Sequence, residues 1–103
     1  MQSRDRFEEM LEHVAAAVLR ASEHRAAGRL DDAQRELDDA WSRAVGLKRS
    51  DVSRLDASTF QMLVGAKKGP AAALLEAQAT LEDARGDAPL AAMFRQRAAA
   101  LQK

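Results

Sequence analysis

The chain has 103 residues, enough for one domain with a single core, and we treat 1–103 as that domain. It carries 16 basic and 16 acidic residues, a balance that argues against a dedicated nucleic-acid binder. It has no cysteine, which excludes disulfides, and no apolar run long enough to span a membrane. The segment 1–12 is too charged for a signal peptide, so we expect a cytoplasmic protein.

The composition favours an all-α fold. Alanine, the strongest helix former, is abundant, whereas β-branched residues are few and aromatic residues make up 4% of the chain. The expected architecture is a set of about five helices arranged as antiparallel helical hairpins.

The first predicted hairpin covers 3–46. Its first helix starts at an N-cap on Ser3 and ends before Gly28, where glycine supplies a left-handed turn. Its second helix starts after an N-cap on Asp31 and ends before Gly46. The short linker requires the two helices to pack antiparallel. The apolar stripes that face inward are Phe7, Met10, Leu11, Val14, Val18 and Ala21, followed by Leu30, Ala33, Leu37, Ala40, Trp41 and Ala44.

The segment 47–68 is predicted to be an insert with a short helix. Ser50 or Asp51 is expected to cap a single turn that carries Val52 and Leu55. A short helix then starts at Asp56 or Ser58 and ends at the glycine-rich run that begins with Gly65. Its inward residues are Phe60, Leu63 and Val64.

The second predicted hairpin covers 69–102. Pro70 suits the first turn of its first helix, and Gly86 forms the turn between its two helices. Asp87 is the expected N-cap of the last helix, with Pro89 in the first turn. Gln78, Arg95 and Arg97 interrupt the inner stripes of this hairpin, which are otherwise Leu74, Leu75 and Leu81, then Leu90, Met93, Phe94, Ala98 and Leu101.

Charge is unevenly distributed along the chain. Residues 1–42 hold 6 basic and 10 acidic residues, a net charge of −4, whereas 43–68 hold 6 and 2, a net charge of +4. The basic segment is interpreted either as a solvated region that complements the acidic helices or as a patch for an anion or acidic partner. The residues of that candidate anion patch are Lys48, Arg49, Arg54, Lys67 and Lys68.

No residues form a recognisable catalytic, cofactor-binding or metal-binding pattern. His13 and His24 lie eleven positions apart, about 16 Å along a helix, which is too far to share a metal ion. Glu9 and His13 lie one helical turn apart and are most simply a solvated pair. The run 65–70 lacks the strand, the glycine spacing and the hydroxyl residue of a phosphate-binding loop. We expect neither enzymatic activity nor a cofactor.

A pattern of small residues occurs twice and resembles tetratricopeptide repeats. Gly28 and Gly86 each follow an alanine by seven residues, and each is followed by alanines at offsets of five and twelve. The two copies are 58 residues apart, whereas such repeats recur about every 34 residues. The whole chain resembles a family of small, uncharacterised bacterial proteins with a tetratricopeptide-like fold, on segments 27–33, 45–63 and 81–101. That resemblance implies no catalytic residues.

These patterns lead to the hypothesis of a non-enzymatic protein-interaction or self-assembly module. The last helix is expected to leave an open face, so we predict a homodimer or a larger complex through it. The candidate contact residues are Leu90, Phe94 and Leu101, and Trp41 is interpreted as a core anchor or a binding hot spot. The alternatives are a regulatory module that binds nucleic acid or an acidic partner through 43–68, and an enzyme with an unrecognised site.

Overall fold

The computed structural model describes residues 2–102, with side chains from residue 6 onward. It is all α-helical within those residues, which confirms the predicted fold class. Six α-helices and one short π-helix follow one another, one α-helix more than expected, because residues 49–54 form a helix of their own. The elements are α1 (Gln2–Ala26), α2 (Leu30–Ala40), η1 (Trp41–Val45), α3 (Arg49–Arg54), α4 (Ala57–Val64), α5 (Lys68–Arg85) and α6 (Ala88–Leu101).

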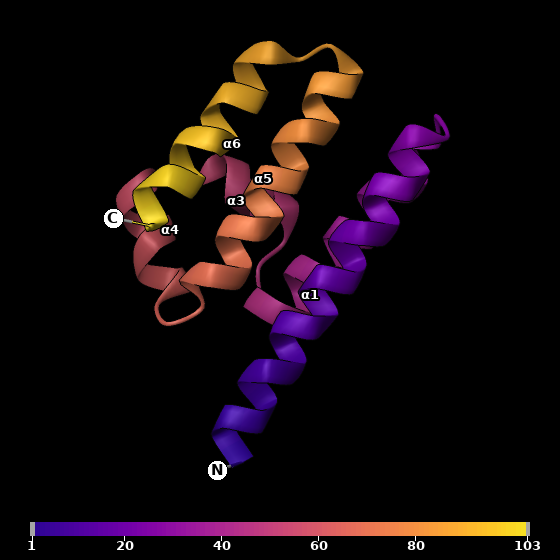
Figure 1. Ribbon diagram of the computed structural model, residues 1–103. Helices are drawn as coiled ribbons and strands as arrows, with labels where there is room; N and C mark the ends of the chain where they lie inside the picture. The colour runs from indigo at the N-terminus through magenta and orange to yellow at the C-terminus, as the bar shows by residue number, and fades with distance from the viewer. Residues whose placement is uncertain (1, 103) are drawn as a thin grey trace.

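The central element is α5. It packs against α6 on one side and against α1 and α2 on the other (Figure 1). Its buried residues form a broad face of the helix, whereas Ala73, Glu76 and Asp83 on the other side are exposed. The buried residues are Pro70, Ala71, Ala72, Leu74, Leu75, Gln78, Ala79, Leu81 and Glu82. Alanines on α5 and its neighbours allow the helix axes to approach closely. The large side chains at the centre of the core are Trp41, Phe60 and Phe94, with the Trp41 and Phe60 rings edge to face at 6.3 Å.

Glycines close the helices where the sequence pattern places them. Gly28, Gly46 and Gly86 follow α1, η1 and α5, and all have φ near +80°, the left-handed region that glycine favours. The turn at Gly86 is short, and α5 and α6 run in opposite directions beside each other (Figure 1). Backbone conformation therefore sets these helix ends without support from side chains.

Two of the predicted N-caps are confirmed. Asp56 accepts a hydrogen bond from the Thr59 backbone N–H at 2.8 Å, and Asp87 accepts one from the Leu90 N–H at 3.1 Å. Hydrogen bonding from Thr59 lowers the pKa of Asp56. This cap therefore favours the folded state above the ordinary aspartate pKa and loses that effect as the pH falls through the lowered value.

Other predicted helix starts are wrong or lie outside the described side chains. Asp31 lies within α2, which begins at Leu30 after Arg29 with no side-chain cap. Helix α3 begins at Arg49, so neither Ser50 nor Asp51 caps it. The backbone of Ser3 is already helical, and its side chain lies outside the described part of the chain.

The second helix ends differently from the continuous α-helix that the sequence predicts. Its last five residues, Trp41–Val45, form a π-helix, and the Gly46 N–H bonds the Trp41 carbonyl at 2.9 Å. The wider turn occurs where the largest side chain of the protein, Trp41, is fully buried. The indole N–H of Trp41 has no hydrogen-bond partner among the described residues.

Gly28 and Gly69 provide a matched test of backbone conformation. A Cβ atom at either position meets no atom within 4 Å, but only Gly28 has a positive φ, of +81°. Gly28→Ala should lower the free energy of unfolding by about 1–2 kcal/mol through backbone strain alone. Gly69→Ala, inside α5, should leave it unchanged or raise it by up to about 1 kcal/mol. Urea unfolding measures both, and equal effects would contradict this explanation.

Ala40 provides a test of close packing. It is fully buried, whereas Ala26 at the end of α1 is exposed. Ala40→Leu should lower the free energy of unfolding by about 1–3 kcal/mol, because the core has no space for three more carbons. Ala26→Leu should be nearly neutral by the same measurement. A large effect at Ala26 would show that the packing face of these helices has been misassigned.

Candidate interaction site

The N-terminal turns of α1 extend beyond the rest of the molecule (Figure 1). They carry Phe7 and Leu11, whose exposed fractions are 41% and 39%, and the first buried residue of the helix is Val14. In the predicted inner stripe, Met10 is partly buried against the core and Val14 is buried, whereas Phe7 and Leu11 are exposed. Phe7 and Leu11 do not belong to the core, contrary to the sequence prediction.

A hollow of about 130 Å³ lies beside the covered part of α1. It is lined by residues of α1, α2 and α5, and most of its wall is apolar. Alanines at 21, 33 and 77 leave the space that larger side chains would fill, and Arg25 stands at its polar side with Ser22 and Thr80. The remaining lining residues are Val18 and Leu81.

The exposed end of α1 and the hollow belong to one face of the helix. Residues 7, 11, 18, 22 and 25 are separated by four, seven, four and three positions, which places them along one side of a helix. Val14 lies on the same side between the exposed end and the hollow, and it is buried. We call Phe7, Leu11, Val18, Ser22 and Arg25 the α1 strip. Phe7 and Arg25 are 18 positions apart, which corresponds to about 27 Å along the helix. It begins with exposed apolar side chains and ends with a cation that hydrogen-bonds the Ser22 hydroxyl at 3.4 Å.

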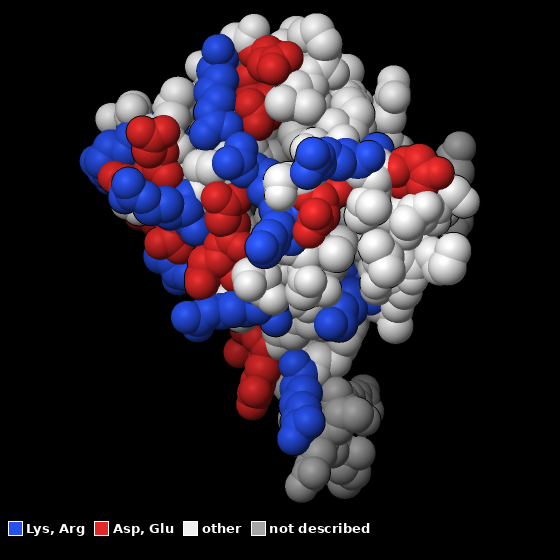
Figure 2. Space-filling view, turned by 180° about the vertical axis from the view of Figure 1, so that it is seen from behind, with Lys and Arg blue, Asp and Glu red and all other residues white. Residues whose placement is uncertain are grey.

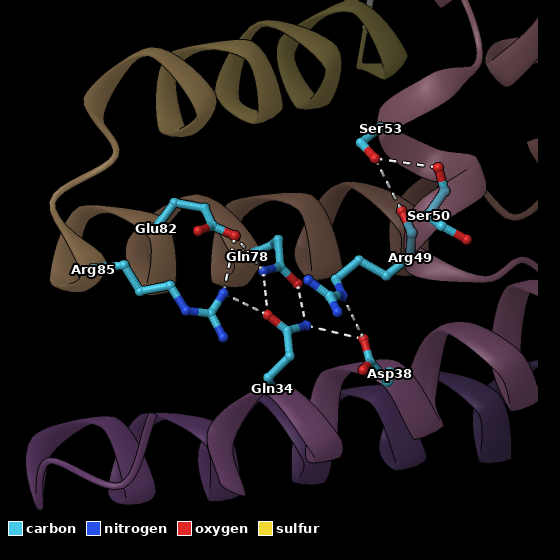
Figure 3. A network of polar contacts seen from close by, with 8 residues as sticks. All are labelled: Gln34, Asp38, Arg49, Ser50, Ser53, Gln78, Glu82 and Arg85. Atoms are coloured by element: carbon cyan, nitrogen blue, oxygen red, sulfur yellow. Dashed lines mark hydrogen bonds and ion pairs between the residues drawn. The ribbon is translucent and has the colours of Figure 1, made fainter. Parts of the chain in front are cut away.

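A second polar feature lies inside the protein, between α2 and α5 (Figure 3). The side-chain amides of Gln34 and Gln78 bond each other in both directions, at 2.9 and 2.7 Å. Gln34 also donates to Asp38, and Gln78 donates to Glu82, each at 2.9 Å. Arg85 completes this amide network by donating to Gln34 Oε1 at 2.7 Å and to Glu82 Oε2 at 3.1 Å. Gln34, Gln78 and Glu82 are buried, and each has partners.

The sequence pattern does not predict the amide network, because Gln78 interrupts an apolar stripe and gives no sign there of its partner on α2. The spacing of amides and acids in the sequence does indicate such a network. Gln34 precedes Asp38 by four residues, and Gln78 precedes Glu82 by four, so each helix carries an amide and an acid on one face. Asp38 also binds Arg49 at 3.2 Å, which links the network to the start of α3.

The two arginines of α6 have definite partners. Arg97 donates to the backbone carbonyls of Val52, at 2.6 Å, and of Leu55, and its guanidinium lies 5.6 Å from the Phe60 ring centre. Arg95 bonds Asp83 on α5, an interaction that raises the pKa of Arg95. The sequence pattern suggests that Arg97 interrupts the packing of α6. In the structure Arg97 instead connects α6 to residues 52–60.

These contacts correct the predicted partner surface on α6. Phe94 and Leu101 are 1% and 3% exposed, Trp41 is fully buried, and Leu90 is half-buried. Residues 49–64 fold back beside α6, so the face expected to be open is covered within the chain (Figure 1). In α4, Leu63 is 55% exposed and Met62 is 76% exposed, so Leu63 does not face inward as predicted.

The candidate anion patch is partly neutralised. Arg49 pairs with Asp38, and the neighbouring Arg43 pairs with Asp39 at 3.0 Å. A second hollow is lined by Lys48 and Arg49 together with Asp38, Ser42 and Ser50. Lys67 and Lys68 do not line it. On the face opposite to that of Figure 1, basic and acidic side chains alternate (Figure 2). For Arg43 and Arg49, the structure thus supports the interpretation of basic residues that complement acidic helices.

The histidines have separate surroundings. His13 Nε2 lies 3.9 Å from Asp39 Oδ2, and His24 Nδ1 accepts a hydrogen bond from Arg29 at 3.0 Å. Glu9 and His13 line a shallow hollow with Arg6 and Arg43 among its walls. Within the described residues, no group of three histidine, aspartate or glutamate side chains is placed to hold a metal ion.

Comparisons with known proteins give no relative. No protein family matches the chain, and neither the curated proteins nor the solved structures contain a match. None of the helices in residues 2–102 combines the length and the apolar character needed to cross a membrane.

The amide network generates a stability prediction. Gln78→Leu should lower the free energy of unfolding by about 1–3 kcal/mol, because it leaves the buried Gln34 amide short of partners. The Gln34→Leu/Gln78→Leu double variant should lose less stability than the two single variants together, since neither amide is then left unpaired. Urea unfolding of the four proteins measures the coupling. Strictly additive losses would show that the two amides act independently.

Proposed function

We propose that this chain is a non-enzymatic protein-interaction and self-assembly module, and that its contact surface is the α1 strip. The observation that carries the proposal is the projection of α1 with Phe7 and Leu11 exposed. Exposed apolar side chains next to an apolar hollow are typical of contact surfaces on proteins. We further propose that the helix pairs are tetratricopeptide-like and that the module acts in the cytoplasm, where a chain without cysteine needs no oxidising environment.

The alternative function, binding of an acidic partner or nucleic acid through 43–68, has weaker support. The ion pairs of Arg43 and Arg49 with α2 reduce the charge that this segment offers to a partner. Phe7 and Leu11 carry no charge that an ion pair could neutralise, and both are exposed. We therefore place the contact surface on α1.

The decisive variant is Phe7→Asp. It places a charge on the exposed end of the strip, so it should abolish association while leaving the thermal unfolding midpoint of the isolated chain nearly unchanged. Gel filtration with light scattering measures self-association. Affinity capture with the immobilised wild-type chain and the immobilised variant measures the binding of other proteins.

Met62→Asp is the matched control. Met62 is the most exposed of the large apolar residues, at 76%, and lies on α4, away from the strip. The Met62→Asp variant should retain every association of the wild type. The proposal is wrong if the wild type and Phe7→Asp have the same mass in solution and capture the same proteins, or if Met62→Asp loses the association as well.

A further inference from the structure

We propose that the hollow between α1, α2 and α5 binds a small organic monocarboxylate with a short apolar tail, held through its carboxylate by Arg25. This inference goes beyond the proposed function, because it concerns the hollow and not the exposed end of α1 at Phe7 and Leu11. Ligand sites on proteins combine mainly apolar walls with a few polar groups that fix the orientation of the ligand. The hollow has both parts, since most of its wall is apolar and Arg25, Ser22 and Thr80 form its polar side.

The charge of Arg25 is not neutralised by a neighbouring acid. Its guanidinium hydrogen-bonds the Ser22 hydroxyl at 3.4 Å, and within residues 6–102 it forms no ion pair. Arg20 on the same helix, in contrast, pairs with Glu36 at 2.7 Å. No aspartate or glutamate is among the described residues that line the hollow. A partly buried cation therefore stands beside apolar walls without an anion, and a ligand can supply one.

The hydrogen-bonding groups of the hollow favour a carboxylate as that anion. The Thr80 hydroxyl already donates to the Glu76 carbonyl at 3.1 Å, so the donors that face a ligand are those of Arg25 and Ser22. The planar guanidinium presents parallel N–H groups that match the two oxygens of a carboxylate. A phosphate group carries more charge and more acceptor oxygens, and would need more donors than one guanidinium and one hydroxyl. The site therefore suits a monoanion.

The size of the hollow limits the apolar part of the ligand. Its volume of about 130 Å³ is slightly less than that of an apolar cavity of about 150 Å³, which accommodates benzene. A tail of about four to six carbons therefore fits between the alanines at 21, 33 and 77, with Val18 and Leu81 completing the apolar wall. The hollow is partly open to solvent, which gives such a ligand a way in. Hexanoate falls within this range and is a suitable probe.

NMR titration of the full chain tests the site, with the backbone amides of the lining residues as reporters. Hexanoate should shift these amides in a saturable manner. Acetate, which has no tail to bury, and pentylammonium, which carries the opposite charge on a tail of the same length, should bind at least about tenfold more weakly. Equal binding of pentylammonium, or the absence of a saturable shift with hexanoate, would overturn the proposal.

Arg25→Gln tests the role of the cation, because it removes the charge and keeps a polar side chain. It should weaken hexanoate binding about tenfold or more, as expected for the loss of a charge-assisted hydrogen bond. Arg54→Gln is the matched control: it removes the same charge from the chain, but Arg54 is exposed on α3 and does not line the hollow. Arg54→Gln should bind hexanoate as the wild type does. Equal affinities of Arg25→Gln and the wild type would contradict the assignment of the carboxylate to Arg25.

Ala77→Leu tests the position of the tail, because the added carbons should occupy the hollow. Hexanoate binding should be lost, while the thermal unfolding midpoint stays unchanged or rises as the space is filled. Ala73→Leu, one turn earlier on α5 and exposed, should retain binding. Retained binding by Ala77→Leu would show that the tail lies elsewhere and would overturn the site. Phe7→Asp should bind hexanoate like the wild type, so its effect on association tests the proposed function separately from this site.

Discussion

The hydrogen bonds between the Gln34 and Gln78 side chains determine how α2 lies along α5. Because the Gln78 side chain on α5 is fully buried, its amide needs a buried partner, and Gln34 supplies it. A slide of one helix past the other would break both bonds and separate each amide from its neighbouring acid. Since α2 is joined to α1 through the turn at Gly28, the same pairing also positions α1 beside α5. The hollow next to the α1 strip thus depends on a polar contact in the core.

Alanine has two opposite effects in this fold. Alanines such as Ala40, Ala71 and Ala91 are fully buried and allow neighbouring helices to pack closely. At Ala21, Ala33 and Ala77, where three helices meet, the same small side chain leaves a recess that the chain does not fill. A protein with few large apolar residues therefore has both a tight core around Trp41 and an unfilled hollow beside α1.

Local sequence signals predicted the helix ends best. Gly28, Gly86 and Asp87 act through their own backbone or the next turn, so their roles follow from the sequence alone. Whether a stripe is covered depends on distant segments. Phe94 is buried in a core to which α5 and other segments contribute, whereas Phe7 is 41% exposed. Periodicity reveals the apolar face of a helix but not how far its neighbours extend along it. For this reason the sequence predicts exposed apolar residues on α6, where Phe94 and Leu101 are buried, and does not predict the exposure of Phe7 and Leu11 on α1.

The interior contacts and the exposed apolar side chains of α1 consequently lie in different parts of the molecule. The amide network and the aromatic residues lie inside, and Arg97 fastens residues 52–60 onto α6. Phe7 and Leu11 contribute little to this interior, since much of each side chain already faces solvent. The hollow beside α1 belongs to both the interior and the surface. Its walls are formed by residues of α1, α2 and α5, and it is partly open to solvent. A change in the amide network that shifts α2 would also reshape the surface offered to a partner, whereas a change at Phe7 would leave the interior as it is.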